Sequence, residues 1–324
     1  MKHNIGVTGT GSLIGQAIIK SIKNSNESNN FKIIGFDYFN DTVGSFLCER
    51  NYKLTDIYTN PDLEENWLQE ILSHIKEELI DILFIGIDFE LELFAKYKSL
   101  IEKNSKCKII ISSLDAIKIG NDKYLTYEFL KNNNLNYPVT NLPEDVNFSE
   151  IDYPVIVKPR VGARSRGVFK VNNKEELLSK IKNIENPIIQ EYVGDESTEY
   201  TCGIICLDGE LKASIALNRT LKEGNTFISE HSKKADKIII NYISDIANKL
   251  KPYGSCNLQL RIDKKGVPKL FEINPRHSGT TYIRSLFGFN EILYIINYII
   301  KGKETEMVLK EGRAIRFFDE KLIK

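Results

Sequence analysis

The chain has 324 residues, of which 42% are hydrophobic and 27% are charged, a composition typical of a folded protein with two or three lobes. Lys plus Arg and Asp plus Glu both number 44, so no net charge attracts nucleic acid or an anionic membrane, and we expect neither as a partner. No apolar run approaches the roughly 18 residues of a membrane-spanning helix. The first residues enter a strand directly and the five cysteines lie scattered without a CxxC pair, so we expect no secretory leader and a reducing, cytoplasmic location.

The first third of the chain alternates short apolar strands with amphipathic helices. The strands are expected at residues 4–9, 31–37, 80–88 and 106–113. The helices are expected in SLIGQAIIKSIKNS after the first strand, at residues 67–79 and in LELFAKYKSLIEKN. This alternation is typical of a parallel sheet with helices on both faces, and the best domain boundary lies near residues 114–120.

A glycine-rich turn follows the first strand. VTGTGSLIG places Gly9, Gly11 and Gly15 in a GxGxxxG pattern, one residue off the dinucleotide fingerprint, and Asp37 ends the next strand where a ribose-binding acid would lie. One interpretation is a nicotinamide site, and the Tyr-x-x-x-Lys of residues 127–131 would then suit an NAD(P)-dependent reductase. The other is a tight turn that needs glycine for backbone reasons, with the tyrosine and lysine as ordinary helical neighbours.

The pattern changes after residue 120. A helix is expected over residues 121–135, with Asn121 or Asp122 as its cap, and strands dominate from residue 153. The Asp-Gly signal in LDGE (207–210) predicts a hairpin turn. The remaining expected elements are a helix at about 234–251, two strands joined by KKG, a helix near 289–301 and a closing strand at 312–320.

One lysine lies at the end of an apolar strand in YPVIVKPRVGARSRGVFKV (153–171). Lys158 is followed by a stretch with Gly162, Gly167 and three arginines, and then by another strand. A strand–loop–strand of this kind can fold over a triphosphate, because loop amides and basic side chains cover the phosphates while the lysine points up from the strand. The alternative is a solvated basic hairpin.

The next apolar strand, in PIIQEYVGDESTEYT (187–201), runs into Gln190, Glu191, Tyr192 and Val193. An adenine ring needs an apolar slot with backbone donors and acceptors along a strand edge, and a hinge segment can supply both. Glu199 begins the following strand, where its carboxylate could accept the ribose hydroxyls. Each acid alone also fits a surface glutamate.

Two strands late in the chain carry oxygen ligands on one face. In NLQLRIDKKGVPKLFEINPR, Glu272 and Asn274 share a face because strand side chains alternate, and Gln259 can fall on that face across the hairpin. One carboxylate and two amide carbonyls suit Mg²⁺ bound together with nucleotide phosphates. Arg276, just beyond the strand, can clamp a transferring phosphoryl group. An unpartnered strand carboxylate is expensive to bury, which weakens a purely structural interpretation.

In this order, IVKP, QEYV…EY and GSCNLQLRID…LFEINPRHSG resemble the ATP-grasp superfamily. The likeness is to the ATP-grasp unit of the carbamoyl-phosphate synthetase large subunit and to small stand-alone carboxylate–amine ligases. The resemblance implies an α/β and α+β fold. A Rossmann-like parallel-sheet domain at 1–115 would precede an ATP-grasp fold of two α+β lobes, a small lobe with a lid loop at 116–190 and a large lobe with the metal site and a C-terminal strand at 191–324.

The resemblance also implies roles for individual residues. Those expected to bind ATP are Lys123, Lys158, Arg166, Gln190, Glu191, Tyr192, Val193 and Glu199. Those expected to hold Mg²⁺ or Mn²⁺ are Gln259, Glu272 and Asn274, with Arg276 and Lys158 as catalytic cations. Candidate substrate contacts are Arg160, Arg164, His277 and Arg284. For the lid arginines the alternative is phosphate contact or solvation, and for His277 it is a hydrogen bond to another side chain.

The family implies a ligase that activates a carboxylate with ATP as an acyl phosphate, which an amine or a thiol then displaces. The expected partners are small-molecule carboxylates and amines, and a homodimer is left open. A kinase on the same scaffold, a reductase and an ATP-binding module without chemistry remain alternatives. The lid RVGARSRG is more basic and less glycine-rich than that of the synthetase, and the chain has one ATP-grasp unit instead of two, so carbamoyl-phosphate synthesis is not expected.

Overall fold

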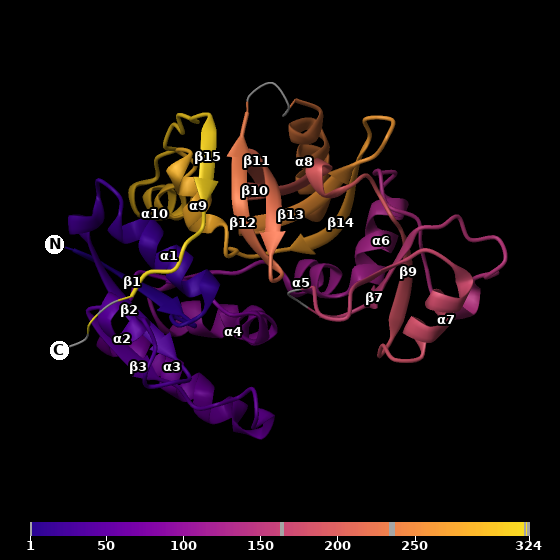
Figure 1. The fold of residues 1–324 in the computed structure, drawn as a ribbon. Helices are drawn as coiled ribbons and strands as arrows, with labels where there is room; N and C mark the ends of the chain where they lie inside the picture. Colours follow the sequence, from indigo (N-terminus) through magenta and orange to yellow (C-terminus); the bar gives the residue numbers. More distant parts are fainter. Residues whose placement is uncertain (1, 163–164, 233–236, 321, 323–324) are drawn as a thin grey trace.

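The computed structural model describes residues 2–162, 165–232, 237–320 and 322. In Figure 1 an N-terminal parallel sheet lies at the lower left, a large sheet above it and a small sheet with its helices at the right. No helix within the described ranges is long and apolar enough to cross a bilayer. The fold class is the expected one: a Rossmann-like α/β sheet followed by two α+β units.

The N-terminal sheet has the strand order β3-β2-β1-β4-β5, and all its pairs are parallel. Its strands are β1 (His3–Thr8), β2 (Phe31–Asp37), β3 (Arg50–Lys53), β4 (Ile82–Phe84) and β5 (Lys108–Ile110). Its helices are α1 (Leu13–Lys23), α2 (Gly44–Leu47), α3 (Glu64–Glu77) and α4 (Leu91–Asn104). Alternate residues of β2 face opposite sides: Ile33 packs toward α1 and Ile34 toward α3, which explains why these strands are apolar throughout. The short β3 was not predicted.

The small sheet has the order β6-β9-β7-β8 and carries the predicted Lys158 strand in its middle. Its strands are β6 (Thr140–Asn141), β7 (Val155–Pro159), β8 (Phe169–Val171) and β9 (Pro187–Glu191). Helix α7 (Lys174–Ile181) packs on this sheet, and α6 (Lys123–Asn132) contacts both β6 and β14. Helix α5 (Leu114–Asn121) contacts α6 and β14. Asp122 caps α6 by accepting hydrogen bonds from the amides of Tyr124 and Leu125, which confirms one of the two predicted caps. The sequence analysis missed α7.

The large sheet has the order β14-β13-β10-β11-β12-β15, with antiparallel pairing throughout. Its strands are β10 (Glu199–Leu207), β11 (Glu210–Lys222), β12 (Asn225–His231), β13 (Gly254–Ile262), β14 (Pro268–Asn274) and β15 (Gly312–Ile315). Its helices are α8 (Lys237–Leu250), α9 (Thr281–Leu286) and α10 (Glu291–Lys301). The predicted hairpin between β10 and β11 is confirmed, because Asp208 and Gly209 both have the positive φ of its tight turn.

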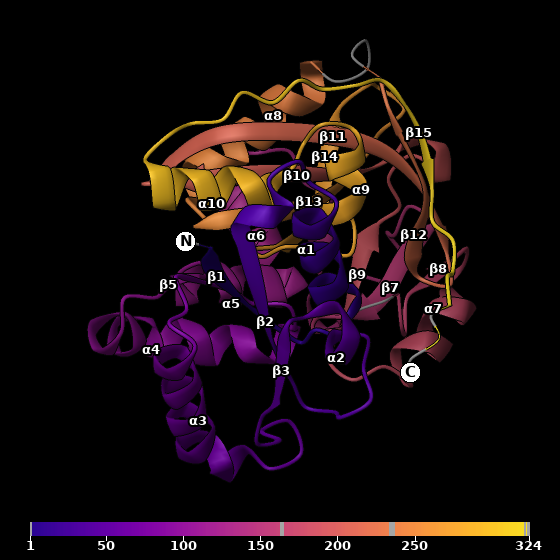
Figure 2. The same cartoon turned by 90° about the vertical axis from the view of Figure 1, so that its left-hand side faces the viewer.

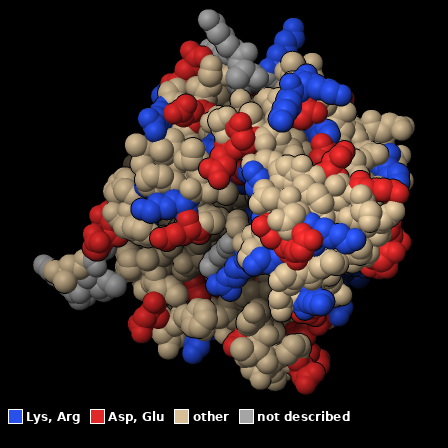
Figure 3. Space-filling model, turned by 45° about the vertical axis from the view of Figure 1, so that its right-hand side comes forward, with Lys and Arg blue, Asp and Glu red and all other residues tan. Residues whose placement is uncertain are grey.

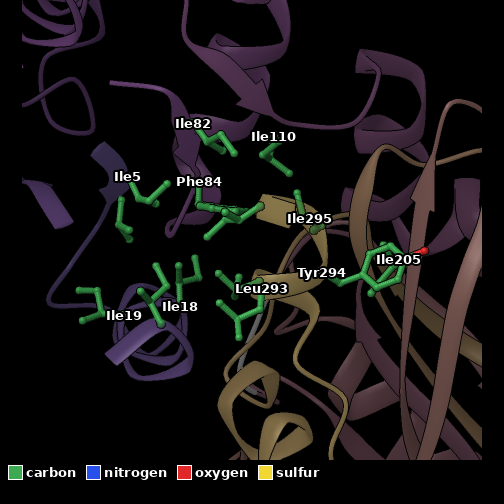
Figure 4. Close-up of a cluster of buried hydrophobic side chains, with 14 of the residues drawn as sticks. Ile5, Ile18, Ile19, Ile82, Phe84, Ile110, Ile205, Leu293, Tyr294 and Ile295 are labelled. Atoms are coloured by element: carbon green, nitrogen blue, oxygen red, sulfur yellow. The ribbon is translucent and has the colours of Figure 1, made fainter. Parts of the chain in front are cut away.

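The first and last parts of the chain share one hydrophobic core. Figure 4 shows Ile5 of β1, Phe84 of β4 and Leu293 and Ile295 of α10 gathered in this core, which also includes Ile205 of β10. Helix α1 lies against α9 and α10, as Figure 2 also shows. Close packing of these buried side chains fixes the N-terminal sheet relative to the large sheet. The turns that follow β1 and β4 are therefore held in a fixed position beside the large sheet.

Candidate functional site

A cavity of about 160 Å³ lies between the small sheet and the large sheet. Its wall brings together most of the residues expected to bind ATP, which are Lys123, Lys158, Arg166, Gln190, Glu191, Val193 and Glu199. Two of the expected metal ligands, Gln259 and Glu272, line it as well. Five basic residues and three acidic residues line it, and the basic ones are Lys123, Lys158, Arg166, Arg219 and Arg261. Since the whole chain is neutral and Figure 3 shows acidic and basic side chains interspersed on the outer surface, this local excess of positive charge belongs to the cavity.

Two buried lysines point into this cavity from different elements. Lys158 ends β7, and its Nζ donates a hydrogen bond to Oε1 of Gln190 at 2.8 Å. Burial and the nearby charge of Lys123 lower the pKa of Lys158 to about 7. Lys123 begins α6, donates from Nζ to the carbonyl of Gly162 at 2.9 Å, and also has a pKa lowered by burial. Within the described residues, neither lysine forms an ion pair with an acid, whereas Arg160 and Arg219 do. The phosphates of a bound nucleotide would place negative charge beside both ammonium groups.

The strand edge expected to hold adenine has a fixed backbone. Glu191 ends β9, where its carboxylate accepts hydrogen bonds from Nζ of Lys269 at 2.6 Å and from the amide of Val139 at 3.0 Å. Val193 is buried in the cavity wall. Tyr192 lies under the ammonium of Lys170, 4.0 Å from its ring centroid, and does not line the cavity, so its side chain faces away from the expected adenine position.

Glu199 is more heavily engaged than the sequence analysis expected. Oε1 accepts hydrogen bonds from Nε and Nη2 of Arg219 at 2.9 and 2.7 Å, and Oε2 accepts from Nε of Arg261 at 2.9 Å. The carboxylate therefore holds two arginines at the wall of the cavity. Its contact with ribose stays a prediction, and in this conformation a ribose would have to compete with both guanidinium groups.

The three expected metal ligands lie together on the large sheet. Gln259 of β13 pairs directly with Glu272 of β14, and Asn274 follows two residues along the same strand. Oε1 of Glu272 accepts from Nε2 of Gln259 at 3.3 Å and from Nδ2 of Asn274 at 2.8 Å. No ion pair is recorded for Glu272 in the part of the chain that the structure describes. One carboxylate flanked by two amides fits a hard divalent cation once the amide oxygens turn toward it.

Two arginines beside these ligands donate hydrogen bonds to the amide oxygens. Nη2 of Arg219 donates to Oε1 of Gln259 at 2.6 Å, and Nη2 of Arg276 donates to Oδ1 of Asn274 at 3.0 Å. Arg276 also forms an ion pair with Asp88, which follows β4 of the N-terminal sheet. The Arg276 guanidinium is thus positioned at the metal patch by a residue from the first domain.

A second cavity, of about 190 Å³, lies on the other side of this patch. It is bounded by the N-terminal turns at 12–14 and 86–88, by the 224–226 hairpin and by 278–280. The two cavities share three wall residues, which are Arg219, Gln259 and Glu272. A group bound in the first cavity and a group bound in the second would therefore meet at the carboxylate of Glu272.

Arg284 does not lie where a substrate can reach it, so its assignment as a substrate contact was wrong. Its side chain is fully buried and forms an ion pair with Glu291, at 2.9 Å from Nε to Oε2. It also donates from Nη1 to Asn257 at 2.9 Å. Burial alone would raise the pKa of Glu291, but the charges of Arg284 and His277 hold it well below the usual range of a carboxylic acid. His277 is buried with Nδ1 3.0 Å from Oε1 of the same Glu291, as the hydrogen-bond alternative anticipated.

The lid arginines lie in different surroundings. Arg160 forms a bidentate pair with Asp122, at 3.0 and 2.7 Å to Oδ2, and lines neither of the two cavities, so the structure does not place it at a substrate. Arg166 lines the first cavity. Arg164 lies outside the described residues.

The N-terminal glycine turn is closed by its own contacts. Oδ2 of Asp37 accepts from the amide of Gly11 at 2.6 Å and from the hydroxyl of Thr10 at 2.8 Å, so the acid ties the turn together. A Cβ on Gly15 would lie 2.2 Å from the carbonyl oxygen of Gly9. These contacts favour the backbone explanation for the glycines over a dinucleotide site.

Sequence reasoning missed several residues of the two cavities. Arg219, Arg261 and Phe271 line the first, and Asp88 and Arg316 line the second. Phe271 and Arg261 belong to the two strands already quoted, so their proximity to the metal face was a usable signal. Asp88 and Arg316 come from opposite ends of the chain, and no sequence spacing brings them together.

Comparisons with known proteins agree with this geometry. Residues 120–280 match the ATP-grasp domain family. A D-alanine–D-alanine ligase of Bacillus anthracis is 28% identical over 152 residues, which cover 40% of this chain and 47% of the relative. A carbamoyl phosphate synthase large chain of Clostridium perfringens is 26% identical over 227 residues, covering 62% of this chain and 20% of the relative. The chain spans about half the length, or less, of these curated relatives.

Solved structures show the same fold over nearly the whole chain. An L-amino acid ligase from Bacillus licheniformis superposes with a TM-score of 0.71 at 16% identity, covering 93% of this chain and 74% of that one. The biotin carboxylase domain of a Hydrogenobacter thermophilus 2-oxoglutarate carboxylase, solved with MgADP and bicarbonate, superposes with a TM-score of 0.73 at 15% identity, covering 97% and 74%. We conclude that residues 120–280 form an ATP-grasp domain, and that the chain has the fold of these structures.

Proposed function

We propose that the chain is an ATP-dependent ligase that joins a carboxylate of one small metabolite to an amine, or to a thiol, of another. The observation that carries this proposal is the shared wall of the two cavities. The first is lined by cations and an apolar strand edge, which suits a nucleotide, and the second is polar and open to the same Glu272. A phosphoryl group at the end of the nucleotide would lie at that wall, facing a substrate in the second cavity.

The residues of the first cavity support a division of labour. Val193 and the backbone of β9 would hold the adenine, and Lys158 and Lys123 would neutralise the phosphates. Glu272, Gln259 and Asn274 would hold Mg²⁺ or Mn²⁺, which when bound offsets negative charge on the phosphate oxygens. The MgADP complex of the structural relative supports this choice of cofactor for the fold.

The proposed reaction has two steps that balance without a protein nucleophile. An oxygen of the substrate carboxylate attacks the γ-phosphorus while the bond to the β,γ-bridging oxygen breaks, giving an acyl phosphate and ADP. A neutral amine then attacks the acyl carbon, phosphate leaves and the amine loses a proton, giving an amide. Arg276 and Lys158 stabilise the charge that moves between these oxygens, and the cavity walls restrict water.

An ADP-release screen over amino acids and amino sugars tests the proposal. ADP should appear only with a competent substrate, and Glu272→Gln should lower turnover on the order of 100-fold or more because the metal patch loses its only charge. Glu230→Gln, an exposed acid on β12, is the matched control and should keep its turnover. Unchanged ADP release by folded Glu272→Gln in the presence of Mg²⁺ would show that the metal assignment is wrong.

A further inference from the structure

The second cavity contains an arginine whose charge is not balanced. Arg316 follows β15 and reaches the cavity, where Nη2 donates to the carbonyl of Gly279 at 2.5 Å. Its Nε is buried without a hydrogen-bond partner. Burial lowers the pKa of Arg316, and among the residues that the structure describes no acidic group offsets that effect. By contrast, three other arginines that line the two cavities each form an ion pair with an acid. These are Arg219, Arg261 and Arg276.

A half-buried guanidinium without a counter-charge is costly, because part of the charge has left water without gaining a partner of opposite charge. A bound anion would remove this cost. Arginine presents a planar fork of donors that matches a carboxylate. The free Nε and the chain's own hydroxyls at Ser278 and Thr280, which line the same cavity, mark the place where such an anion would be held.

The charged residues of the second cavity that have no role in the proposed reaction indicate what ligand the cavity binds. Its wall contains three arginines, 219, 276 and 316, and two acids, Asp88 and Glu272. Glu199 neutralises Arg219, and the proposed reaction assigns Glu272 and Arg276 to the metal and the phosphoryl group. Arg316 and Asp88 remain, one positive and one negative. Asp88 is half exposed, so it can accept a second cation besides Arg276.

We propose that the second cavity binds an α-amino acid, with its carboxylate on Arg316 and its ammonium group directed to Asp88. This inference deepens the proposed function, on which it rests, by naming the amine substrate. The cavity of about 190 Å³ has room for roughly six water molecules, which is the size of a small amino acid. Asp88 lies beside Arg276, where the acyl group would form. The ammonium group would lose one proton to solvent there and then attack as the neutral amine.

Equilibrium binding by calorimetry tests this assignment without depending on turnover. The full chain, saturated with Mg²⁺ and a non-hydrolysable ATP analogue, is titrated with each of the common L- and D-amino acids. For any that bind, the decarboxylated amine and the amino-acid amide are titrated in parallel. We expect both to bind at least 30-fold more weakly, because they lack the anion that Arg316 requires.

Two substitutions at residue 316 then separate charge from packing. Arg316→Gln should weaken amino-acid binding at least 30-fold, Arg316→Lys should recover part of it, and neither should change the affinity for the ATP analogue. Arg313→Gln is the matched control, because Arg313 lies on β15, three residues before Arg316, and is exposed in a pair with Glu230. If Arg316→Gln fails to fold, the amine and amide analogues still decide the question with the unmodified chain.

The outcomes distinguish this inference from the proposed ligase activity. Binding of an amino acid that depends on Arg316, together with no ADP release from ATP, would support the site and overturn the ligase. ADP release with a carboxylate and a non-amino-acid amine, with no amino acid bound, would support the ligase and overturn the site. Equal binding of an amino acid and its decarboxylated amine would also overturn it.

Discussion

Lys158 makes nucleotide binding dependent on pH in a direction that the structure specifies. Its folded-state pKa is about 7 without a ligand, because burial and Lys123 disfavour the charged form. Phosphate oxygens beside Nζ would favour the charged form and raise that pKa. At about pH 8.5 only a few per cent of the unliganded protein carries the proton, so binding of MgATP should take up about one proton from solution. Affinity should fall up to about tenfold for each pH unit above 7.

Calorimetry in buffers with different ionisation enthalpies measures the proton uptake directly. Lys158→Arg is the decisive variant, because arginine stays charged across this range and should bind the nucleotide with little proton uptake and little pH dependence. Lys158→Met should lose affinity at every pH. If the unmodified protein takes up no proton near pH 8.5, or Lys158→Arg takes up just as much, the assignment of Lys158 to the phosphates is refuted.

The lowered pKa of Lys158 also makes the free energy of unfolding depend on pH. This dependence has the opposite sign to that of a lysine in an ion pair, whose pKa is raised. The folded pKa of about 7 lies below the ordinary value of 10.5, so between these limits the unfolded chain binds more protons. Stability without nucleotide should therefore rise with pH from 7 to 10.5, by an amount on the order of 5 kcal/mol. Urea unfolding of the protein without nucleotide should show this rise, and Lys158→Met should remove most of it, leaving the smaller contribution of Lys123.

Two further substitutions test the packing around the site. Glu291→Gln leaves Arg284 buried without a counter-charge and should lower the free energy of unfolding, measured in urea, by about 3–5 kcal/mol. Glu230→Gln, which removes one partner of an exposed pair, should change it by less than about 1 kcal/mol. Equal effects of the two substitutions would contradict the buried pair. Gly15→Ala would place its Cβ 2.2 Å from the carbonyl oxygen of Gly9 and should cost on the order of 2–4 kcal/mol, and a variant as stable as the unmodified chain would show that the turn can move.

The parts of the site that the sequence predicted are those set by local periodicity. Glu272 and Asn274 share a face because side chains alternate along a strand, and the short KKG turn brings Gln259 to within one position of Glu272. The direct pairing of Gln259 with Glu272 needs a register shift between Gln259 and Leu260, which the sequence did not predict. Lys158 was recognisable as a lone charge at the end of an apolar strand. The parallel sheet followed from the alternation of strands and helices. The three expected metal ligands lie within about 15 positions of one another, and each strand and helix of the parallel sheet was recognisable from its own short segment.

The parts that escaped prediction depend on contacts between distant segments. Asp88 reaches Arg276 only because the shared core holds the N-terminal sheet beside the large sheet. Arg316 reaches the second cavity because β15 joins β12 at the edge of the large sheet. Arg284 shows the opposite error: a short-range signal was overlooked, since Glu291 is seven residues away at the start of an apolar helix. A buried acid so close to an arginine is better explained as its partner than as a coincidence.

The hydrogen bonds around Glu272 predict that metal and nucleotide bind together. In the unliganded arrangement Gln259 and Asn274 turn their N–H groups to Glu272, while their oxygens accept from Arg219 and Arg276. A cation on Glu272 needs those oxygens, so binding it releases two guanidinium donors into the cavities. The phosphate oxygens of a nucleotide can accept hydrogen bonds from these Nη2 groups of Arg219 and Arg276. If no nucleotide is bound, each of these lost hydrogen bonds costs about 1–3 kcal/mol. Mn²⁺, followed by its electron paramagnetic resonance signal, should therefore bind at least tenfold more tightly in the presence of ADP than alone, beyond the affinity of ADP itself for the ion. Equal Mn²⁺ affinity with and without the nucleotide would mean that the two amides do not turn.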